Sequence, residues 1–214
     1  MVLKLYGFSV STCTRRVGTV LHEKHVPFEF YEIDHTKGEH KSPAFLEKQP
    51  FGQAPYIDDD GFILYESRAI CRYIATKYAS QGTPLIPTDP KANALFEQAA
   101  SIELSNFDAY AAPAVYEKVF KTYQGLPTDE ALVQRYLTSL DQKLEVYDKI
   151  LSKQEYLGGN EVTLADLFHL PYGTALAIAG SDLMTNRPNV KRWFDSLVNR
   201  PSWQAVKDNV KATA

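Results

Sequence analysis

The hydrophobic periodicity of this chain changes once, near residue 80, and that change limits the folds it can adopt. Before it, short stretches with apolar residues at alternate positions are interleaved with stretches of helical spacing. Their order is strand, helix, strand, helix, strand, strand, helix. This order predicts an α/β domain, a small mixed four-stranded sheet with helices packed on it. After residue 88 the spacing is helical throughout, so the rest of the chain is predicted to be all-α.

Turn and cap residues set the boundaries of the first part. Asp59-Asp60-Gly61 has typical hairpin chemistry. Ser80–Pro87 contains one glycine and two prolines and is typical of a linker. The strands and helices predicted before the linker are residues 2–6, 12–24, 28–33, 42–48, 54–58, 62–65 and a helix from Glu66. The expected domains are residues 1–79, a linker at 80–88 and a helical domain at 89–214.

The helical part contains one strong local signal. Thr163 and Asp166 have the spacing of a capping box, and Val162 and Leu167 can form the hydrophobic staple around it. Pro113 should kink the long helix in which it lies, because proline removes a backbone donor. The other helices predicted are residues 89–122, 129–153, 189–199 and 202–210.

Composition and charge narrow the class of partner. The chain has 214 residues, 44% hydrophobic and 23% charged, which is ordinary for a soluble globular protein. Its net charge of −3 gives no reason to expect nucleic acid or an acidic membrane as partner. No apolar run approaches the roughly 20 residues that span a bilayer, and the N-terminus has strand rather than signal-peptide character. Cys13 and Cys71 lack metal-ligand spacing, so neither a metal nor a disulfide is expected, and the expected compartment is a reducing cytoplasm.

The stretch Ser9–Val17 places hydroxyl residues where a predicted strand, Val2–Tyr6, gives way to a helix. The unpaired N–H groups and the positive dipole of a helix start can hold an anion, including a thiolate. The alternative is that Ser11 or Thr12 only caps the helix, since both residue types are common N-caps.

Four motifs, in order and in register, make the first part resemble the cytosolic glutathione transferases, most closely the phi class of plants and fungi. The motifs are Ser11–Val17, Gly38–Pro43, Gln49–Pro55 and Tyr65–Ile70. The helical part resembles that family in organisation and around Gly158–Asp166. The resemblance implies a thioredoxin-like first domain, a homodimer, and glutathione as cosubstrate with no separate cofactor. It also implies hydrophobic electrophiles as acceptors, such as activated aromatic halides, isothiocyanates and hydroperoxides.

The resemblance further implies how glutathione is held. Glu66 and Ser67 match the positions that take the γ-glutamyl amine and carboxylate. Pro55 matches the family's cis-proline, which turns the backbone of residue 54 toward the ligand; Ala54 stands where Val is usual. The plainer alternatives are that Glu66-Ser67 simply caps a helix and that Pro55 is an ordinary trans proline at a strand edge. His40 and Lys41 match the positions that take the glycyl carboxylate, and their alternative is a solvated surface pair. The full set implied is Ser11, Thr12, His40, Lys41, Gln53, Ala54, Pro55, Glu66 and Ser67.

Three residues compete to stabilise the glutathione thiolate. Ser11 matches the phi-class catalytic position, where a hydroxyl donates to the thiolate without being the nucleophile. Cys13 lies two residues further on, and other classes form mixed disulfides through a cysteine near this point. The alternative is that Cys13 only packs, as a small buried apolar side chain does. Tyr6 ends the first strand, where several animal classes use a tyrosine, or it packs against the sheet. Ser11 is the preferred candidate.

The acceptor pocket is expected between the domains, although most aromatic residues at helical spacing belong to a core. The residues expected in it are Val10, His35, Phe107, Tyr110, Pro113, Tyr116, Phe120 and Leu170. Phe51 looks like the aromatic plug that enters a partner's helical domain in the family, or makes a local core contact. Two other functions stay open: a thioltransferase or dehydroascorbate reductase working through Cys13, and a carrier that binds hydrophobic ligands without turnover.

Overall fold

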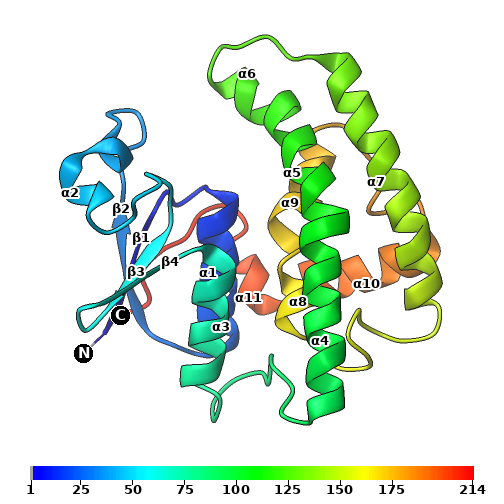
Figure 1. The fold of residues 1–214 in the computed structure, drawn as a ribbon, viewed down its shortest axis with the longest axis horizontal. Helices are drawn as coiled ribbons and strands as arrows, with labels where there is room; N and C mark the ends of the chain where they lie inside the picture. Colours follow the sequence, from blue (N-terminus) through cyan, green and yellow to red (C-terminus); the bar gives the residue numbers. More distant parts are fainter. Residues whose placement is uncertain (1) are drawn as a thin grey trace. The chain divides into compact units, whose positions relative to one another are not determined.

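The computed structural model describes residues 2–214, which form two compact units. The first contains the residues up to Ile86 together with Arg200–Ala214, and the second is Pro87–Asn199. The first holds the sheet and the second is helical (Figure 1). The sequence predicts one helical domain from residue 89 to the end, but the contacts of residues 200–214 are with the first unit.

The first unit is built on a four-stranded mixed sheet in the order β2-β1-β3-β4. Strand β1 (Leu3–Gly7) pairs parallel with β2 (Phe28–Glu32) and antiparallel with β3 (Tyr56–Asp59). Strand β4 (Phe62–Tyr65) completes the sheet antiparallel to β3. Parallel neighbours need a crossover, which α1 (Thr12–Glu23) supplies. The predicted mixed four-stranded sheet is confirmed.

The hairpin between β3 and β4 has the turn that its sequence indicates. Asp59 pairs with Phe62, which leaves Asp60 and Gly61 as a two-residue loop. Both loop residues have positive φ, 57° and 86°, as a type I′ turn requires. The Asp58 carboxylate accepts a hydrogen bond from the Gly61 N–H at 2.8 Å, so the register of β4 is fixed locally.

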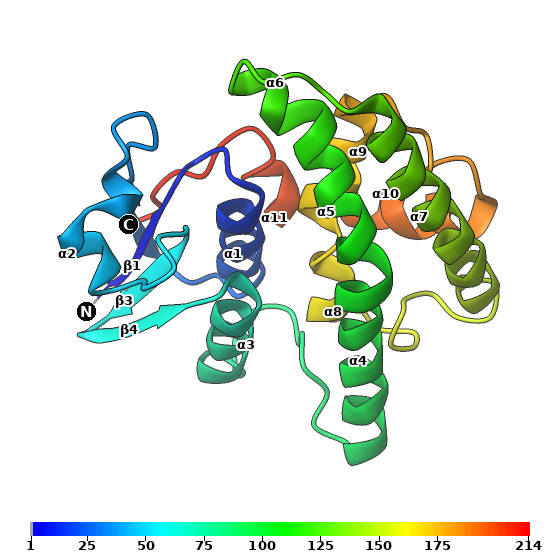
Figure 2. The same ribbon diagram turned by 45° about the horizontal axis from the view of Figure 1, so that its top comes forward.

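Helices cover both faces of the sheet. Figures 1 and 2 show α1 beside α3 (Ser67–Lys77) on one face and α2 (Pro43–Leu46) on the other. The alternation along β1 sends the buried Leu3 and Leu5 to one side of the sheet. On the α2 side, Phe45 packs in a cluster with Tyr56.

The C-terminal segment folds back on α1. Its only helix among the described residues is α11 (Pro201–Gln204), so the predicted helix over 202–210 is wrong beyond residue 204. Val206 and Val210 are buried, and a Cβ added to Gly18 of α1 would lie 3.1 Å and 3.2 Å from their methyl groups. This packing against a glycine buries both valines without helical periodicity.

A buried carboxylate fastens the linker and the C-terminal segment to the end of α1. Glu23 is 5% exposed and accepts two hydrogen bonds from the Arg200 guanidinium, at 2.6 and 2.8 Å. It also accepts from the hydroxyls of Ser202 and Thr83, each at 2.5 Å. Burial pushes the pKa of Glu23 upward, but hydrogen bonds from Arg200, Ser202 and Thr83 outweigh it, so the pKa lies below its usual value.

We expect Glu23→Gln to lower the free energy of unfolding by about 2–4 kcal/mol at neutral pH, because the half-buried Arg200 loses its counter-charge. The pKa of Glu23 is depressed in the folded state, so its contribution is present above the unfolded value of 4.5 and is lost as the pH falls further. The difference between variant and wild type in urea unfolding should therefore shrink below that pH. Glu145→Gln, which breaks an exposed pair with Lys149, is the control and should cost under about 1 kcal/mol. A Glu23→Gln variant as stable as this control would contradict the prediction.

The second unit begins with a long helical rod that bends without breaking. Pro113 lies inside the rod, which changes direction along α5 and α6 in both views (Figures 1 and 2). Two π-helical stretches flank the proline and absorb the irregular hydrogen bonding. The rod consists of α4 (Pro90–Ile102), the π-helix Glu103–Asp108, α5 (Ala109–Val115), the π-helix Tyr116–Phe120 and α6 (Lys121–Tyr123).

The remaining helices pack around one core. Leu140, Leu144 and Tyr147 lie on the buried face of α7, as its apolar spacing predicts. Trp193, fully buried, contributes to the same core from α10. The helices are α7 (Glu130–Leu151), α8 (Leu164–Leu167), α9 (Leu170–Ile178) and α10 (Pro188–Val198).

The predicted capping box at α8 is present and is connected more widely than the sequence indicates. Asp166, with no exposed surface, accepts hydrogen bonds from the N–H and hydroxyl of Thr163 at 2.9 and 3.0 Å. Its other oxygen accepts from the Leu157 N–H at 2.9 Å and from the Trp193 indole at 3.0 Å. One carboxylate therefore joins a helix start, the loop before it and α10.

Candidate active site

Ser11 caps α1 and keeps a hydrogen available for another acceptor. Its Oγ accepts from the Thr14 N–H at 3.4 Å, and its backbone is extended, as at an N-cap. A hydroxyl that accepts one hydrogen bond can still donate its own hydrogen. Within residues 2–214 no acceptor takes the Ser11 hydrogen. Capping the helix and donating to a ligand are therefore compatible roles for this half-buried side chain.

Gly7 joins the start of α1 to the Pro55 loop. A Cβ on Gly7 would lie 2.6 Å from the Thr14 hydroxyl and 3.3 Å from the Pro55 ring. The end of β1, the first turn of α1 and the loop before β3 consequently meet at one point, and only glycine fits between them. Residues that are far apart in the sequence are thereby brought to the same edge of the first unit.

The Ala54-Pro55 peptide bond is cis, as the resemblance implies. The N–H and C=O groups of Ala54 make no hydrogen bond within residues 2–214. They lie just before β3, beside the exposed Gln53. An extended peptide can pair with such backbone groups as an added strand does.

The lysine matched to the glycyl carboxylate also holds the loop before Gln53. The Lys41 ammonium donates to the carbonyls of Phe51 and Gly52, at 3.2 and 2.8 Å. The buried Gln49 side chain accepts from the Gln53 N–H at 3.1 Å. Two of the three ammonium hydrogens are used in this way, which leaves one for an anion.

His40 lies in a cluster of rings on the segment between β2 and α2, which contains a short 3-10 helix, Glu39–Lys41. Its ring stacks on His35, with centroids 4.6 Å apart, and Phe8 meets both imidazoles edge-on. The Nδ1 atom of His40 is buried without a hydrogen-bond partner. Burial, together with the charges of His35 and Lys41, lowers the pKa of His40. The lower pKa favours the uncharged form of the ring.

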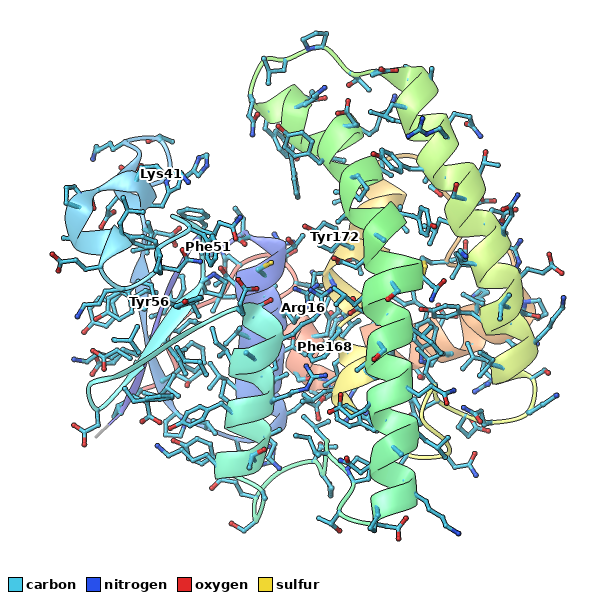
Figure 3. The ribbon with its side chains drawn as sticks, in the orientation of Figure 1. Arg16, Lys41, Phe51, Tyr56, Phe168 and Tyr172 are labelled. Atoms are coloured by element: carbon cyan, nitrogen blue, oxygen red, sulfur yellow. The ribbon has the colours of Figure 1, made fainter. Side chains whose placement is uncertain are left out.

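The start of α3 has an unusual backbone and a buried cation behind it. Glu66, its N-cap, has a φ of 70°, which is uncommon outside glycine and often marks ligand sites, and no side chain caps this helix. The neighbouring Ser67 is 7% exposed and accepts a hydrogen bond from Arg16 Nη1 at 2.9 Å. Arg16 extends from α1 and is 1% exposed (Figure 3). Arg16 was not among the predicted site residues. The sequence does contain one sign of its role, because Arg16 is a charged residue four positions before Val20, on the apolar face of α1.

The two cysteines have different environments. Cys13 is half-buried in the first turn of α1, with its Sγ 3.5 Å from Arg16 Nη1. Cys71 is fully buried on α3, and burial raises the pKa of its thiol to about 12. A thiol held neutral in this way is not reactive, so only Cys13 is a candidate for thiol chemistry.

Tyr6 is part of an aromatic stack on the sheet. Its ring lies between Tyr31 and Tyr56, with centroids 4.6 Å from each and nearly parallel planes. The stack belongs to the cluster under α2. Burial raises the pKa of Tyr6, and the pKa of Tyr56 rises to about 12. Packing accounts for Tyr6 in this structure.

Two residues expected in the acceptor pocket lie in the core of the helical unit instead. Phe107 and Leu170 have no exposed surface, and the Phe107 ring lies 4.6 Å from that of His169. Their apolar side chains fill space between helices of this unit, and a place for them in the acceptor pocket stays a prediction. The side chains of the others are exposed or half-buried: Val10, His35, Tyr110, Pro113, Tyr116 and Phe120.

Within residues 2–214, no three His, Cys, Asp or Glu side chains are grouped so that they could bind a metal ion. Over the same range, no helix is both long and apolar enough to cross a membrane.

A mixed four-stranded sheet with a cis-proline before its third strand, followed by a helical unit, defines the glutathione S-transferase fold. The family model "Glutathione S-transferase, N-terminal domain" matches residues 5–83, and "Glutathione S-transferase, C-terminal domain" matches residues 105–201. The chain belongs to the glutathione S-transferase family.

Plant and fungal proteins are among its relatives. Glutathione S-transferase PM239X14 of Arabidopsis thaliana is 48% identical over 91% of this chain and 90% of its own. Glutathione S-transferase hmp2 of Hypomyces subiculosus is 47% identical over 100% of this chain and 99% of its own. The crystal structure of glutathione transferase F7 from Populus trichocarpa, 39% identical, superposes with a TM-score of 0.93 over 96% of this chain and 98% of that one. The predicted resemblance to the phi class, the F series of plants, is confirmed.

Proposed function

We propose that this protein conjugates the thiolate of glutathione to hydrophobic electrophiles, with glutathione as cosubstrate, in the cytoplasm. The observation that carries the proposal is the Ser11 hydroxyl at the start of α1, whose hydrogen has no acceptor among the described residues. Names of relatives at up to 48% identity agree with this activity. The acceptor would bind beside the thiol, where the exposed Val10 supplies apolar surface.

Glutathione would bind in an extended form across the edge of the first unit. Its γ-glutamyl carboxylate meets the Ser67 hydroxyl and the uncapped start of α3, where an anion is stabilised, and its amine meets Glu66. The cysteinyl backbone pairs with Ala54, next to Gln53. The glycyl carboxylate takes donors from the loop that carries His40 and Lys41.

In the reaction the cosubstrate is the nucleophile. The free thiol has a pKa near 8.5, so little thiolate exists at neutral pH, and a donor at a helix start favours the charged form. Ser11 donates its hydrogen to the sulfur. Thr12 is the first residue of α1 and contributes the start of that helix. The thiol proton leaves to solvent. The sulfur then forms a bond to the electrophilic carbon, and with an aromatic halide the halide ion departs with its electron pair.

A second function rests on Cys13. Its half-buried sulfur lies 3.5 Å from Arg16 Nη1 in the first turn of α1, near the hydroxyl of Ser11 in sequence. A thioltransferase would use the Cys13 sulfur to attack a disulfide and form a mixed disulfide with glutathione.

One assay separates these functions. Purified protein with glutathione and 1-chloro-2,4-dinitrobenzene should form the conjugate, and Cys13→Ser should retain that activity. Disulfide exchange that disappears in Cys13→Ser, without conjugation by the wild type, would favour the thioltransferase. Binding of hydrophobic dyes with neither activity would indicate a carrier.

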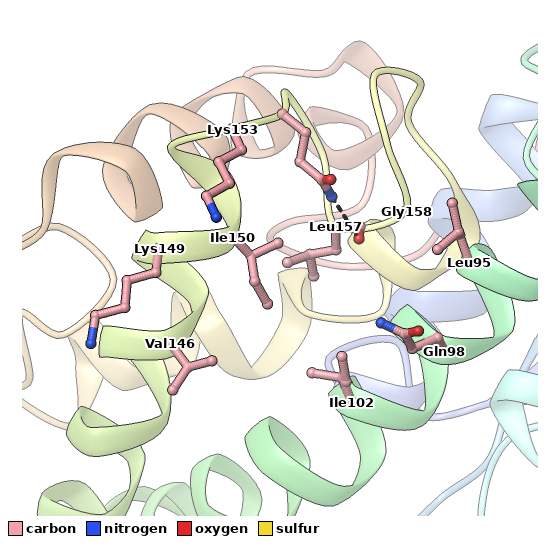
Figure 4. A pocket seen from close by; sticks show the side chains of 10 residues that line it. Leu95, Gln98, Ile102, Val146, Lys149, Ile150, Lys153, Leu157 and Gly158 are labelled. Carbon is pink, nitrogen blue, oxygen red and sulfur yellow. Dashed lines mark hydrogen bonds between the residues drawn. The ribbon is translucent and has the colours of Figure 1, made fainter.

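We also propose a homodimer in which Phe51 enters the helical unit of a second copy. Its ring is 64% exposed in the loop that Lys41 holds, and it meets the Tyr65 ring edge-on. A pocket of about 320 Å³ lies between α4, the end of α7 and the loop after it (Figure 4). Its apolar lining includes Leu95, Ile102, Val146, Ile150 and Leu157, of which Leu95 and Val146 are half exposed. An exposed ring and an exposed apolar pocket on one chain suit a symmetric pair of contacts.

Phe51→Ala should weaken dimerisation by one to two decades, because burying a phenylalanine contributes about 1.5–3 kcal/mol. It should also raise the KM for glutathione, since the same loop leads to Gln53. Val146→Asp should weaken the dimer to a similar extent without raising that KM. Tyr123→Ala, which removes another exposed ring, is the control. Sedimentation measures all three, and a Phe51→Ala dimer as tight as that of wild type would place the interface elsewhere.

A further inference from the structure

The buried Arg16 side chain contacts a residue of the proposed glutathione site but has no part in the chemistry described above. We propose that Arg16 is a positioning residue for the γ-glutamyl carboxylate: it orients the Ser67 hydroxyl and places a positive charge behind the start of α3. This inference rests on the proposed function, because it concerns how that function's cosubstrate is recognised.

The direction of one hydrogen bond carries the argument. A guanidinium has only donors, so in its 2.9 Å contact with Arg16 Nη1 the Ser67 oxygen must accept. The Ser67 hydrogen is therefore directed elsewhere, and within residues 2–214 no acceptor takes it. Ser67 is only 7% exposed, and its hydroxyl still has a hydrogen to donate, so an acceptor on a bound ligand would complete its hydrogen bonding.

Charge decides what kind of acceptor this is. The Arg16 guanidinium, 1% exposed, polarises the hydroxyl it contacts and is screened little by solvent. The N-terminus of α3, an 11-residue helix, has no side-chain cap and adds its dipole at the same point. Both effects favour an anion, and a carboxylate accepts from the hydroxyl and from backbone N–H groups together.

Arg16 also connects the two ends of the site. Its Nη1 lies 3.5 Å from the Cys13 sulfur in the first turn of α1 and 2.9 Å from Ser67 at the start of α3. The turn that follows Ser11 is thereby held against the carboxylate site. A lysine at this position would retain the charge but would lack the rigid, planar guanidinium that places Nη1 within reach of both neighbours.

The test compares glutathione with γ-aminobutyryl-cysteinyl-glycine, which keeps the amine and lacks only the γ-glutamyl carboxylate. Calorimetry should show wild type binding the analogue about 10- to 100-fold more weakly, the range for losing a hydrogen-bonded charge. Arg16→Gln should bind both ligands with nearly the same, weakened affinity, and Arg16→Lys should discriminate to an intermediate degree. Arg15→Gln is the matched control, because Arg15 is the neighbouring arginine on α1 and donates to the carbonyl of Asp208, and it should discriminate as wild type does.

The outcomes separate this inference from the proposed function. If wild type discriminates and Arg16→Gln discriminates equally, the role of Arg16 is overturned while glutathione binding stands. If wild type binds both ligands equally, Ser67 does not recognise the γ-glutamyl carboxylate. That result would contradict both the role of Arg16 and the binding mode proposed for glutathione at Ser67. Circular dichroism reports folding, and loss of the fold in both Arg16 variants would overturn the inference by making Arg16 a residue of the core.

Discussion

Ser11→Ala should lower turnover with 1-chloro-2,4-dinitrobenzene by about 10- to 1000-fold while glutathione still binds, because the donor acts on the charge of the thiolate. The other contacts proposed for glutathione lie at Ala54, Ser67 and the loop with Lys41, and none of them depends on this hydroxyl. The apparent pKa of bound glutathione, read from the pH dependence of kcat/KM, should rise toward that of the free thiol.

The substitution also removes a helix cap, which by itself costs about 1 kcal/mol of stability. Ser11→Asp keeps the cap but has no hydrogen to donate at neutral pH, so its turnover should stay low. Ser11→Thr keeps both and should recover most of the activity. Ser9→Ala, in the same turn, is the matched control and should behave as wild type does. Full turnover in both Ser11→Ala and Ser11→Asp would remove Ser11 from the mechanism.

Asp166→Ala should destabilise the protein by about 3–5 kcal/mol, a large part of the roughly 5–15 kcal/mol that holds a typical protein folded. The change leaves buried donors on Thr163, Leu157 and Trp193 without an acceptor and opens a cavity among them. Urea unfolding should show the loss as a lower midpoint, and little folded protein should survive at physiological temperature.

The control for Asp166 is the same substitution at an exposed cap. Asp129 is the N-cap of α7 and accepts one hydrogen bond, from the Leu132 N–H at 3.0 Å. Asp129→Ala should cost about 1 kcal/mol. Similar losses at both positions would show that Asp166 acts only as a local cap and that its contacts with the loop and α10 contribute nothing.

Those elements whose signals are local follow from the sequence. Alternation fixes the strands, because successive side chains point to opposite faces of a sheet. Asp60-Gly61 determines its own turn, since both residues accept positive φ. Thr163 and Asp166 lie three residues apart, so their capping box depends on short-range geometry alone. The positions of Ser11 and Ser67 at helix starts are predictable for the same reason.

The tertiary structure decided whatever depends on partners distant in sequence. Glu23 lies 177 residues from Arg200, and no local pattern relates them. In the sequence, Arg16 is another charged residue of α1. Only the packing of α3 against α1 brings Ser67 next to it. Helical spacing places Phe107 on an apolar face of its helix. It does not determine whether that face meets a ligand or a neighbouring helix.

The C-terminal segment shows the physical reason most directly. Its sequence is compatible with a helix over 202–210, yet Val206 and Val210 gain more by packing on Gly18 than the backbone would gain from another helical turn. Burial against a distant surface outweighs local propensity. The sequence by itself therefore determined the strands, the turns and the capped helix starts, and the tertiary structure determined which charges are buried, which rings are exposed and where the last helix ends.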